Sequence, residues 1–516
     1  MSPSLRVKGV HVARLLAVLT APLLAACATT AVPPAATPAP AATPPTAPVQ
    51  TEAPAPRAPL QVLTDSLTSL PQFANMHWGI LVVAPERGDT LAAHNADKLA
   101  LPASNMKLIT GAVAVAQLGP DFRWTTTFAR TGPVVNGVLR GDLVVTGRGD
   151  PSVSEAMRGR DPLVAFGPLV AALRAAGIRR IAGRVRTSDA QAFPGSPHGF
   201  GWDWDDLDFD YGAGVTELLF NEGFTRVHVS GCPRTSRTAC VTTSPLRTAP
   251  AMHAAITVRD AGSGPPQLTW WRDSAAVPGL TIRGSIAAGD STAFTAAQPD
   301  ARVTYVAAVT EALTRAGIVV RGRASSTTMS VTPLATLTSP TLAEVLPVMQ
   351  KPSQNQVAEV LYRTLALEKT GVGIPDSGRA VVERQLRDWG VRDEARAIRD
   401  GSGLSRHDYL TPRAIVQVLD AMRRAPTFAM YRDALPVPGM DGTLRFRMQG
   451  LPAGSVQAKT GTVDKARALS GYITTADGEL LLFSVIANNH SVPTREVDRA
   501  AELLVERLVR LRRSAP

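Results

Sequence analysis

Several features that would define a function class are missing from this chain of 516 residues. It has a formal net charge of +11, but it contains no block of basic residues with interleaved aromatic side chains. Arg6, Lys8 and Arg14 lie within the first 27 residues, and the other positive charges are spread thinly, mostly as arginine. We therefore expect no nucleic-acid partner, and at most a weak attraction to anionic polymers of the cell envelope.

Two common hydrolase signatures are also absent. The histidines show no H-x-x-x-H or comparable metal-ligand spacing, which argues against a zinc peptidase. The chain has no G-x-S-x-G elbow either, so a Ser-His-Asp hydrolase of that type is not expected.

An acidic and aromatic run, WDWDDLDFDY, matches a calcium-binding loop only in part. Asp206, Asp208, Asp210 and Glu217 stand at positions 1, 3, 5 and 12 of the loop template. Tyr211 occupies the position where the sharp turn demands glycine, and no helical flanks are evident. We predict a partly exposed aromatic loop near a domain junction, and we expect no metal and no cofactor.

Cysteine is scarce, and the first of the three cysteines closes the leader of the chain. The leader combines a basic start with LLAVLTAPLLAA, an apolar run too short to span a membrane comfortably. Residues 1–27 are therefore predicted to be a secretion signal. Its end, LAAC, resembles a bacterial lipoprotein box, whose cleavage would leave Cys27 as a lipid-modified N-terminus. An ordinary signal peptide cut elsewhere is the alternative.

Residues 28–60 consist mostly of alanine, proline and threonine. Such a tract cannot bury enough apolar surface to fold, and its prolines keep it extended. We predict a tether that holds the folded part away from a membrane. Ala28 follows the lipoprotein box where inner-membrane lipoproteins typically have aspartate, so we expect a periplasmic protein anchored to the outer membrane.

The other two cysteines, Cys232 and Cys240, lie eight positions apart in GCPRTSRTAC. In an exported chain, two close cysteines around a loop of proline, serine and threonine favour a local disulfide. Two unpaired thiols are the alternative.

The folded part divides into three stretches by its pattern of residues. Residues 61–118 contain two predicted strands followed by a helix, and residues 119–335 change to short strands with many turns. Within the second stretch, LRAAGI and LTRAGI each precede a predicted strand, which suggests duplicated α/β units. Residues 336–516 return to long helices and include the clearest hairpin, ALSGYITT with ELLLFSVIANN.

A candidate nucleophile lies at the predicted helix start in the first stretch. Ser104 and Lys107 are three residues apart, so the lysine amine can reach the serine hydroxyl on the same helix face. The hydroxyl needs a base to take its proton. Burial, the positive helix end or a second cation could lower the lysine pKa below its usual value of about 10.4. A capping serine beside a surface lysine is the alternative.

Two further motifs follow in the third stretch. Ser353-Gln354-Asn355 lies where Pro352 separates two helical patterns, and Lys459-Thr460-Gly461-Thr462 lies on a predicted strand. Each motif is common by itself. The order S-x-x-K, S-x-N, K-T-G is a strong signal of one active site when the first motif lies on a predicted helix and the third on a predicted strand.

The ordered motifs resemble the serine penicillin-recognising enzymes, which are the penicillin-binding proteins and serine β-lactamases. The long interval from Lys107 to Ser353 is similar to that of the D-alanyl-D-alanine carboxypeptidase/endopeptidase family of the penicillin-binding protein 4 type, peptidase family S13. GDLVVTGRGDPSV, WDWDD, DGSGLSR and MDGTLRFRM add to the resemblance, which covers about residues 60–510. Gln354 occupies the middle position of the S-x-N motif, where aspartate is common in the family but other residues also occur.

The resemblance implies an α/β fold with a penicillin-binding, serine β-lactamase-like domain, in which helices flank an antiparallel sheet. This domain would be built from residues 61–118 and 336–516. Residues 119–335 would form a large β-rich insertion of one or two subdomains.

The resemblance also implies a role for each motif. Ser104 would attack a peptide carbonyl while Lys107 takes its proton, and the backbone N–H groups of Ser104 and Thr462 would stabilise the oxyanion. Ser353 would relay a proton toward the leaving amine from Lys107 or from Lys459, and Asn355 would hold Lys107 and the substrate amide.

The K-T-G motif would recognise the substrate. Lys459, with Thr460, Gly461 and Thr462, would bind the terminal carboxylate of a D-Ala-D-Ala peptide, and its charge would help to lower the pKa of Lys107.

The expected function is therefore a serine-type DD-peptidase that acts on peptidoglycan peptides through an acyl-enzyme and is inhibited by β-lactam antibiotics such as penicillin. A β-lactamase is one alternative, which the insertion and the absence of a recognisable second base disfavour. A non-catalytic, envelope-binding lipoprotein is the other, and intact Ser104, Lys107 and Lys459 argue against it.

Overall fold

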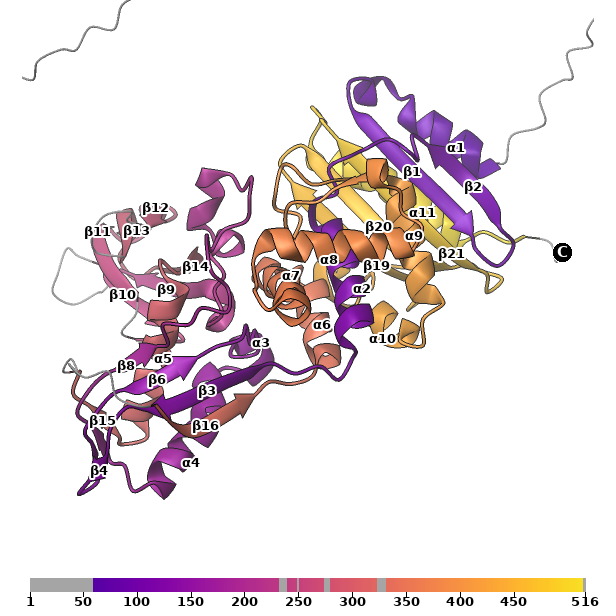
Figure 1. Cartoon of the computed structure of the whole chain (residues 1–516). Helices are drawn as coiled ribbons and strands as arrows, with labels where there is room; N and C mark the ends of the chain where they lie inside the picture. The colour runs from indigo at the N-terminus through magenta and orange to yellow at the C-terminus, as the bar shows by residue number, and fades with distance from the viewer. Residues whose placement is uncertain (1–58, 232–238, 248–249, 273–278, 323–330, 514–516) are drawn as a thin grey trace, which may run out of the picture. The chain divides into compact units, whose positions relative to one another are not determined.

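The central sheet takes its strands from both ends of the folded chain (Figure 1). Its strand order is β19-β20-β21-β1-β2, and all neighbours are antiparallel. The strands are β1 (His77–Ala84), β2 (Asp89–His94), β19 (Val456–Val463), β20 (Ala466–Thr474) and β21 (Leu480–Asn488). The computed structural model describes residues 59–231, 239–247, 250–272, 279–322 and 331–513.

Apolar sequence places β1 and β21 in the middle of this sheet. HWGILVVA and LLLFSVIAN are nearly continuous apolar runs, as expected for strands that are covered on both faces. The predicted hairpin of β20 and β21 is confirmed, with Ala466 paired to Asn488 at one end and Thr474 paired to Leu480 at the other. β19 lies at the edge of the sheet beside β20.

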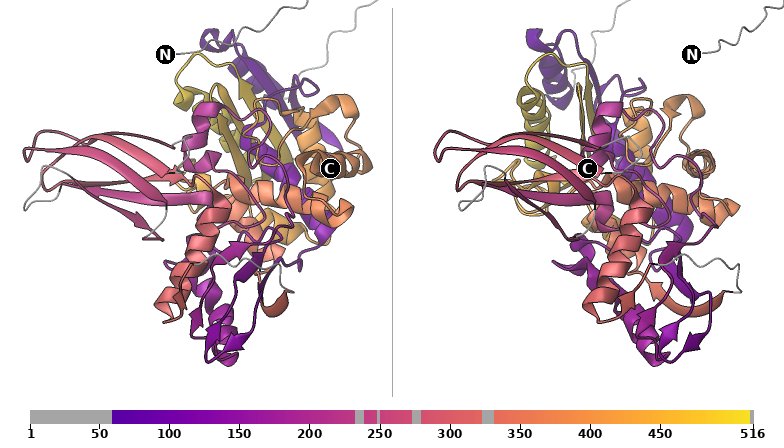
Figure 2. Two further views of the ribbon diagram at one scale, coloured as in Figure 1. Left: turned by 60° about the vertical axis from the view of Figure 1, so that its left-hand side comes forward. Right: turned by 90° about the vertical axis from the view of Figure 1, so that its left-hand side faces the viewer.

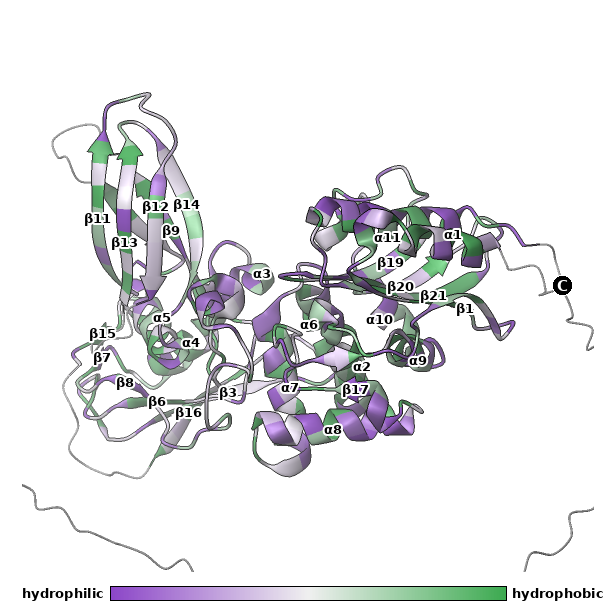
Figure 3. Cartoon of the chain, turned by 90° about the horizontal axis from the view of Figure 1, so that it is seen from above, coloured by the Kyte–Doolittle hydropathy of each residue, from purple (hydrophilic) through white to green (hydrophobic). Residues whose placement is uncertain are grey.

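Helices cover both faces of the central sheet (Figure 3). α1 and α11 share one hydrophobic core with the sheet, and α2, α6, α7, α8, α9 and α10 share the other. The helices are α1 (Pro59–Thr68), α2 (Met106–Leu118), α6 (Leu342–Gln350), α7 (Asn355–Thr370), α8 (Pro375–Asp388), α9 (Pro412–Arg423), α10 (Phe428–Asp433) and α11 (Thr494–Val509). No helix among the described residues has both the length and the apolar character needed to cross a membrane.

The segment between α2 and α6 forms two four-stranded sheets, ordered β16-β3-β6-β8 and β15-β7-β5-β4, from strands near its beginning and its end. Their strands are β3 (Thr125–Arg130), β4 (Val134–Val135), β5 (Val138–Leu139), β6 (Leu143–Thr146), β7 (Arg180–Ile181), β8 (Val185–Thr187), β15 (Val319–Val320) and β16 (Thr332–Thr338). They share a core with α4 (Gly167–Ala175) and α5 (Ala301–Arg315), and α3 (Glu155–Arg158) lies between β6 and α4 in the chain.

The weak repeat seen in the sequence corresponds to two equivalent units of this core. In each, a helix ends at a glycine with positive φ, Gly177 after α4 and Gly317 after α5, and a short strand follows. These strands, β7 and β15, pair with each other in parallel. Because β16 also pairs with β3, the sheet continues past residue 335, and the exact limits of the insertion stay a prediction.

Longer strands form two three-stranded sheets, ordered β10-β9-β14 and β11-β13-β12, which share a small core (Figure 2). The strands are β9 (Phe224–Ser230), β10 (Cys240–Ser244), β11 (Ala251–Arg259), β12 (Gln267–Arg272), β13 (Gly279–Ala287) and β14 (Ser291–Ala297). Cys240 is disulfide-bonded. Its predicted partner Cys232 lies outside the described residues, as does Cys27, so that pairing stays a prediction.

Candidate active site

Ser104 lies in a 3-10 turn, Ala103–Asn105, that leads directly into α2. The α-helix therefore begins at Met106, two residues after the position predicted from the sequence. Residues 106–115 of α2 are all buried, so this helix runs through the core. A helix buried along most of its length gives the Ser104 turn a rigid support.

Close backbone packing shapes this turn. Ala103 has a positive φ of 47°, which is unfavourable for a residue with a side chain. A Cβ on Gly461 of the K-T-G motif would lie 2.6 Å from the Pro102 carbonyl oxygen. A Cβ on Gly403 would lie 1.9 Å from the Ala103 carbonyl oxygen. Both glycines are required because their neighbours approach the turn too closely for any side chain.

The Lys107 amine is surrounded by three hydrogen-bond acceptors. Its Nζ donates to Ser104 Oγ at 2.9 Å, to Asn355 Oδ1 at 2.6 Å and to the Ser402 carbonyl oxygen at 2.8 Å. An ammonium group has three protons and can serve all three. A neutral amine would keep two donors, for Asn355 and Ser402, and direct its lone pair at the Ser104 hydroxyl. The geometry thus suits a base that takes the Ser104 proton.

Burial makes the neutral amine accessible near pH 7. The Lys107 side chain is fully buried, and desolvation of the ammonium lowers its pKa to about 7. The Asp400 and Glu359 carboxyls oppose this shift, because their negative charge favours the protonated amine. Desolvation also lowers the pKa of Lys459 well below its usual value, and the nearby Lys107 adds to the effect.

Asp400 organises the loop that supplies the Ser402 carbonyl. One carboxylate oxygen accepts from the backbone N–H groups of Ser402, at 3.1 Å, and Gly403, at 2.6 Å. The other accepts from the Ser405 N–H and from the Trp202 indole, each at 2.8 Å. Asp400 is 1% exposed, and a buried carboxylate needs such donors to offset the loss of water. DGSGLSR is therefore a folded support for Lys107.

Glu359 of α7 holds the same loop from the other side. Its Oε1 accepts from the backbone N–H groups of Gly401 at 2.9 Å and Ser402 at 2.8 Å. Burial and the neighbouring Asp400 raise the pKa of the Glu359 carboxyl. The backbone of Ser402 therefore connects the two side chains, because its N–H donates to Glu359 and its carbonyl oxygen accepts from Lys107.

Replacing Asp400 by asparagine tests this support. The asparagine side chain has one NH₂ group in place of a carboxylate oxygen, and this group cannot accept from the backbone N–H groups that Asp400 binds. Each buried donor left without an acceptor costs about 1–3 kcal/mol. We expect the free energy of unfolding to fall by about 2–3 kcal/mol, measured by urea denaturation. Asp189→Asn is the matched control, because that carboxylate is fully exposed. Equal stability of the two variants would contradict the role given to Asp400.

The S-x-N motif lies at the junction of α6 and α7, as predicted. Ser353 has a positive φ of 68°. Asn355 accepts from Lys107 through Oδ1, and its Nδ2 donates to the Tyr211 carbonyl oxygen at 2.9 Å. Gln354 Nε2 donates to Glu222 at 2.8 Å. The segment between α2 and α6 thus contacts this motif at two points and fixes the orientation of the asparagine amide.

A cavity of about 590 Å³ brings most of the predicted residues together. Ser104, Ser353, Asn355, Thr460 and Thr462 all line it. The three motifs, although widely separated in sequence, therefore surround one space that is open to a substrate.

The two lysines lie deeper than these residues. Lys459, like Lys107, is fully buried, and its Nζ donates to the Thr460 carbonyl oxygen at 3.0 Å. Neither lysine lines the cavity. Lys459 therefore lies behind the cavity wall, and the threonine hydroxyls of the K-T-G-T stretch form the surface that a ligand meets.

Sequence reasoning gave no role to several residues around this cavity. Arg467 and Thr443 line its wall, and Asp206 and Arg406 add charges of both signs. Thr443 lies in MDGTLRFRM and Arg406 in DGSGLSR, so the motifs that carried the family resemblance marked these segments without assigning them a function. Arg467 had no such signal.

The acidic run contributes an exposed loop beside the cavity, in agreement with the prediction. Trp204 is 85% exposed, while Asp206 and Tyr211 line the cavity. Among the described residues, no group of three or more histidine, cysteine, aspartate or glutamate side chains is placed to hold a metal ion.

Comparison with known proteins agrees with the motifs. A model of the D-Ala-D-Ala carboxypeptidase 3 (S13) family matches residues 60–508. The chain is 31% identical to D-alanyl-D-alanine carboxypeptidase of Actinomadura sp. (strain R39), over 83% of this chain and 81% of that protein. It is 26% identical to D-alanyl-D-alanine carboxypeptidase DacB of Haemophilus influenzae, over 83% of this chain and 88% of the relative.

Among solved structures, penicillin-binding protein 4 (dacB) from Haemophilus influenzae superposes with a TM-score of 0.71 at 24% identity. The match covers 87% of this chain and 99% of the solved chain. It confirms the predicted α/β fold, with its antiparallel sheet, flanking helices and large insertion. The family resemblance drawn from the three motifs is confirmed as well.

Proposed function

Since the chain belongs to the D-Ala-D-Ala carboxypeptidase 3 (S13) family, we propose that it is a serine-type DD-peptidase that works through an acyl-enzyme on Ser104. Its substrates would be peptidoglycan peptides ending in D-Ala-D-Ala. They would also include the D-Ala cross-links of peptidoglycan, in which a D-Ala residue supplies the acyl group as well. The observation that carries the proposal is the contact of Lys107 Nζ with Ser104 Oγ at 2.9 Å, at an amine whose pKa is lowered to about 7.

In the first half-reaction, Ser104 Oγ attacks the carbonyl carbon of the penultimate D-Ala as neutral Lys107 takes the hydroxyl proton. A C–O bond forms, and the carbonyl becomes an oxyanion. The proposed oxyanion donors are the backbone N–H groups of Ser104 and Thr462. Thr462 lies on β19, an edge strand whose alternate N–H groups face away from its one neighbour, which supports this role.

Collapse of the tetrahedral intermediate breaks the C–N bond. The proton held by Lys107 passes to the leaving amine, with Ser353 as the relay, and free D-Ala departs. Water then attacks the Ser104 ester and loses a proton to Lys107, which releases the shortened peptide and regenerates the hydroxyl. Ser353 lines the same cavity as Ser104, which supports the relay.

β-Lactam binding is part of the proposal. A solved structure of the Haemophilus influenzae protein, described as complexed with a novel β-lactam, shares this fold at a TM-score of 0.67. An acyl-enzyme formed with penicillin would retain the opened ring, so the same serine would be blocked.

The function is tested with purified protein and a diacetyl-L-lysyl-D-Ala-D-Ala peptide. We expect release of one D-Ala per peptide, together with labelling of the protein by fluorescent penicillin. A cross-linked muropeptide dimer in the same assay measures endopeptidase activity. Rapid turnover of penicillin without a lasting adduct would instead indicate a β-lactamase, and the absence of both D-Ala release and label would refute the enzyme.

We further propose that the protein is exported to the periplasm and anchored to the outer membrane through lipid on Cys27. The lipoprotein box at the end of the leader and the tether that follows it support this location. Cys27→Ser is expected to move the protein from the membrane fraction to the soluble fraction, as measured by fractionation and immunoblotting. Unchanged partitioning, with no lipid mass on the N-terminal peptide, would contradict the anchor.

A further inference from the structure

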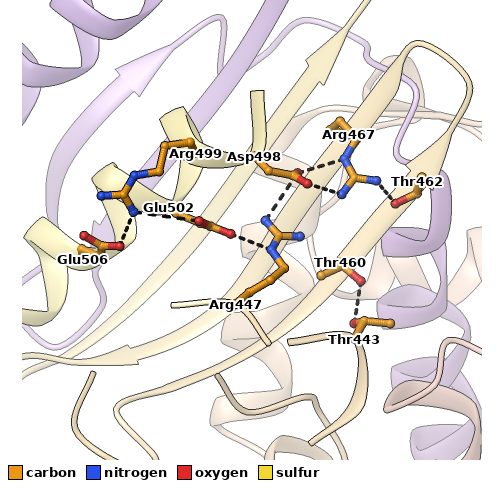
Figure 4. Close-up of polar contacts among 9 residues, drawn as sticks. All are labelled: Thr443, Arg447, Thr460, Thr462, Arg467, Asp498, Arg499, Glu502 and Glu506. Atoms are coloured by element: carbon orange, nitrogen blue, oxygen red, sulfur yellow. Dashed lines mark hydrogen bonds and ion pairs between the residues drawn. The ribbon is translucent and has the colours of Figure 1, made fainter. Parts of the chain in front are cut away.

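A chain of ion pairs joins the wall of the cavity to α11 (Figure 4). Arg467 on β20 stands directly opposite Thr462 on β19, and its Nη1 donates to the Thr462 hydroxyl. Asp498 of α11 holds the other side of the guanidinium, with Oδ1 at 2.9 Å from Nε and Oδ2 at 2.6 Å from Nη2. Such a two-point contact fixes the plane of an arginine side chain.

The chain of ion pairs continues away from the cavity. Arg447 contacts Asp498 at 3.3 Å and Glu502 at 2.6 Å, and Arg499 contacts Glu506 at 2.6 Å. Because each arginine in this chain has a carboxylate beside it, the positive charge of Arg467 is balanced by Asp498. Arg467 is thus better suited to orienting a neighbour than to attracting an anion by itself.

The hydroxyls on the cavity wall differ in what they can offer a ligand. Thr460 Oγ1 and Thr443 Oγ1 share a hydrogen bond at 2.7 Å, so these two hydroxyls are already paired with each other. The Thr462 hydroxyl accepts from Arg467, which occupies a lone pair and leaves its own proton free to donate. Thr462 is exposed, and both it and Arg467 line the cavity.

We infer that Arg467, held in place by Asp498, is a positioning residue that directs the Thr462 hydroxyl as a hydrogen-bond donor to the free α-carboxylate of the substrate's C-terminal residue. The buried Lys459 Nζ donates to the Thr460 carbonyl oxygen and stays behind the cavity wall, so a direct donor to the carboxylate has to come from this wall. The inference rests on the proposed peptidase function and adds to it the two residues, Arg467 and Asp498, that orient the Thr462 hydroxyl toward the carboxylate.

Two matched peptides test the inference. One is diacetyl-L-lysyl-D-Ala-D-Ala, and the other is the same peptide with a C-terminal amide in place of the carboxylate. Arg467→Ala is expected to lower kcat/KM for the acid by about tenfold to a hundredfold, as for loss of a hydrogen bond to a charged group. For the amide, we expect a change of less than about threefold. Asp498→Asn should act in the same direction with a smaller effect.

A double-mutant cycle separates orientation from direct contact. If Arg467 acts through Thr462, Arg467→Ala should cause no further loss for the acid in a Thr462→Val background. Arg499→Ala is the control, because that arginine belongs to the same chain of ion pairs but contacts Glu506 and Glu502, at its far end. It should leave kcat/KM unchanged for both peptides.

Three results would overturn the inference. They are an equal loss for acid and amide in a variant with native thermal stability, additive losses in the cycle, and no loss for the acid in Arg467→Ala. If Arg467→Ala fails to fold, Asp498→Asn and Thr462→Val can be compared on the acid and amide peptides in the same way. Failure of the proposed function is seen separately, because the unmodified protein would then release no D-Ala and take no penicillin label.

Discussion

Replacing Ser104 by alanine is expected to abolish both D-Ala release and penicillin labelling, while the protein remains folded. The nucleophilic oxygen is lost, but the 3-10 turn keeps its shape because alanine fits the same backbone. Mass spectrometry of the tryptic peptides from penicillin-treated protein measures the outcome directly. In the unmodified protein, the penicilloyl adduct should be on Ser104.

The matched control for this prediction is Ser69→Ala, a change at an exposed serine just after α1. It should retain full labelling and full D-Ala release. An adduct on any residue other than Ser104 would overturn the assignment of the nucleophile, however well the three motifs are ordered.

Replacing Lys107 by alanine should slow acylation by about 10²- to 10⁴-fold, the contribution typical of a general base. Ser104 would keep its position but lose the group that takes its proton. Acylation is measured by stopped-flow or quenched labelling with fluorescent penicillin, and circular dichroism establishes that the variant is folded. Lys98→Ala, at an exposed lysine, is the control and should label at the normal rate.

The pH dependence of acylation gives a second test of Lys107. With a pKa of about 7, the amine is mostly protonated below pH 7 and cannot accept the Ser104 proton. Acylation by the unmodified protein should therefore rise as the pH increases through about 7. The Lys107→Ala variant should lose this rise. A rate that stays flat between pH 6 and 8 in the unmodified protein would contradict a neutral Lys107 as the base.

The contact between Ser104 and Lys107 could be predicted from the sequence because both side chains belong to one short motif. Ser104 and Lys107 lie one helical turn apart, so their contact follows from local backbone geometry. The hairpin of β20 and β21 was predictable for the same reason, since its pairing is set by a short turn and a regular apolar pattern. Contacts between residues that are close in the chain can therefore be predicted from the local sequence pattern.

The support of the site was not predictable in this way. The Ser402 carbonyl that accepts from Lys107 is a backbone atom, which any residue could supply, so no side chain in the sequence identifies it. Arg467 and Asp498 are ordinary surface-type residues in sequence, and only the pairing of β20 with β19 and the packing of α11 bring them to Thr462.

The sequence by itself therefore determined which residues are candidates for the active site: a serine with a lysine one turn away, followed by the S-x-N and K-T-G motifs. Only the tertiary structure decided the pKa of the lysine and the depth at which each of these residues lies. A lysine pKa falls when packing removes water from the amine, and that removal depends on every element that surrounds it. The same burial places Lys459 behind the cavity wall and leaves Thr462 at its surface, because depth in a fold is a property of the packed chain and not of the motif.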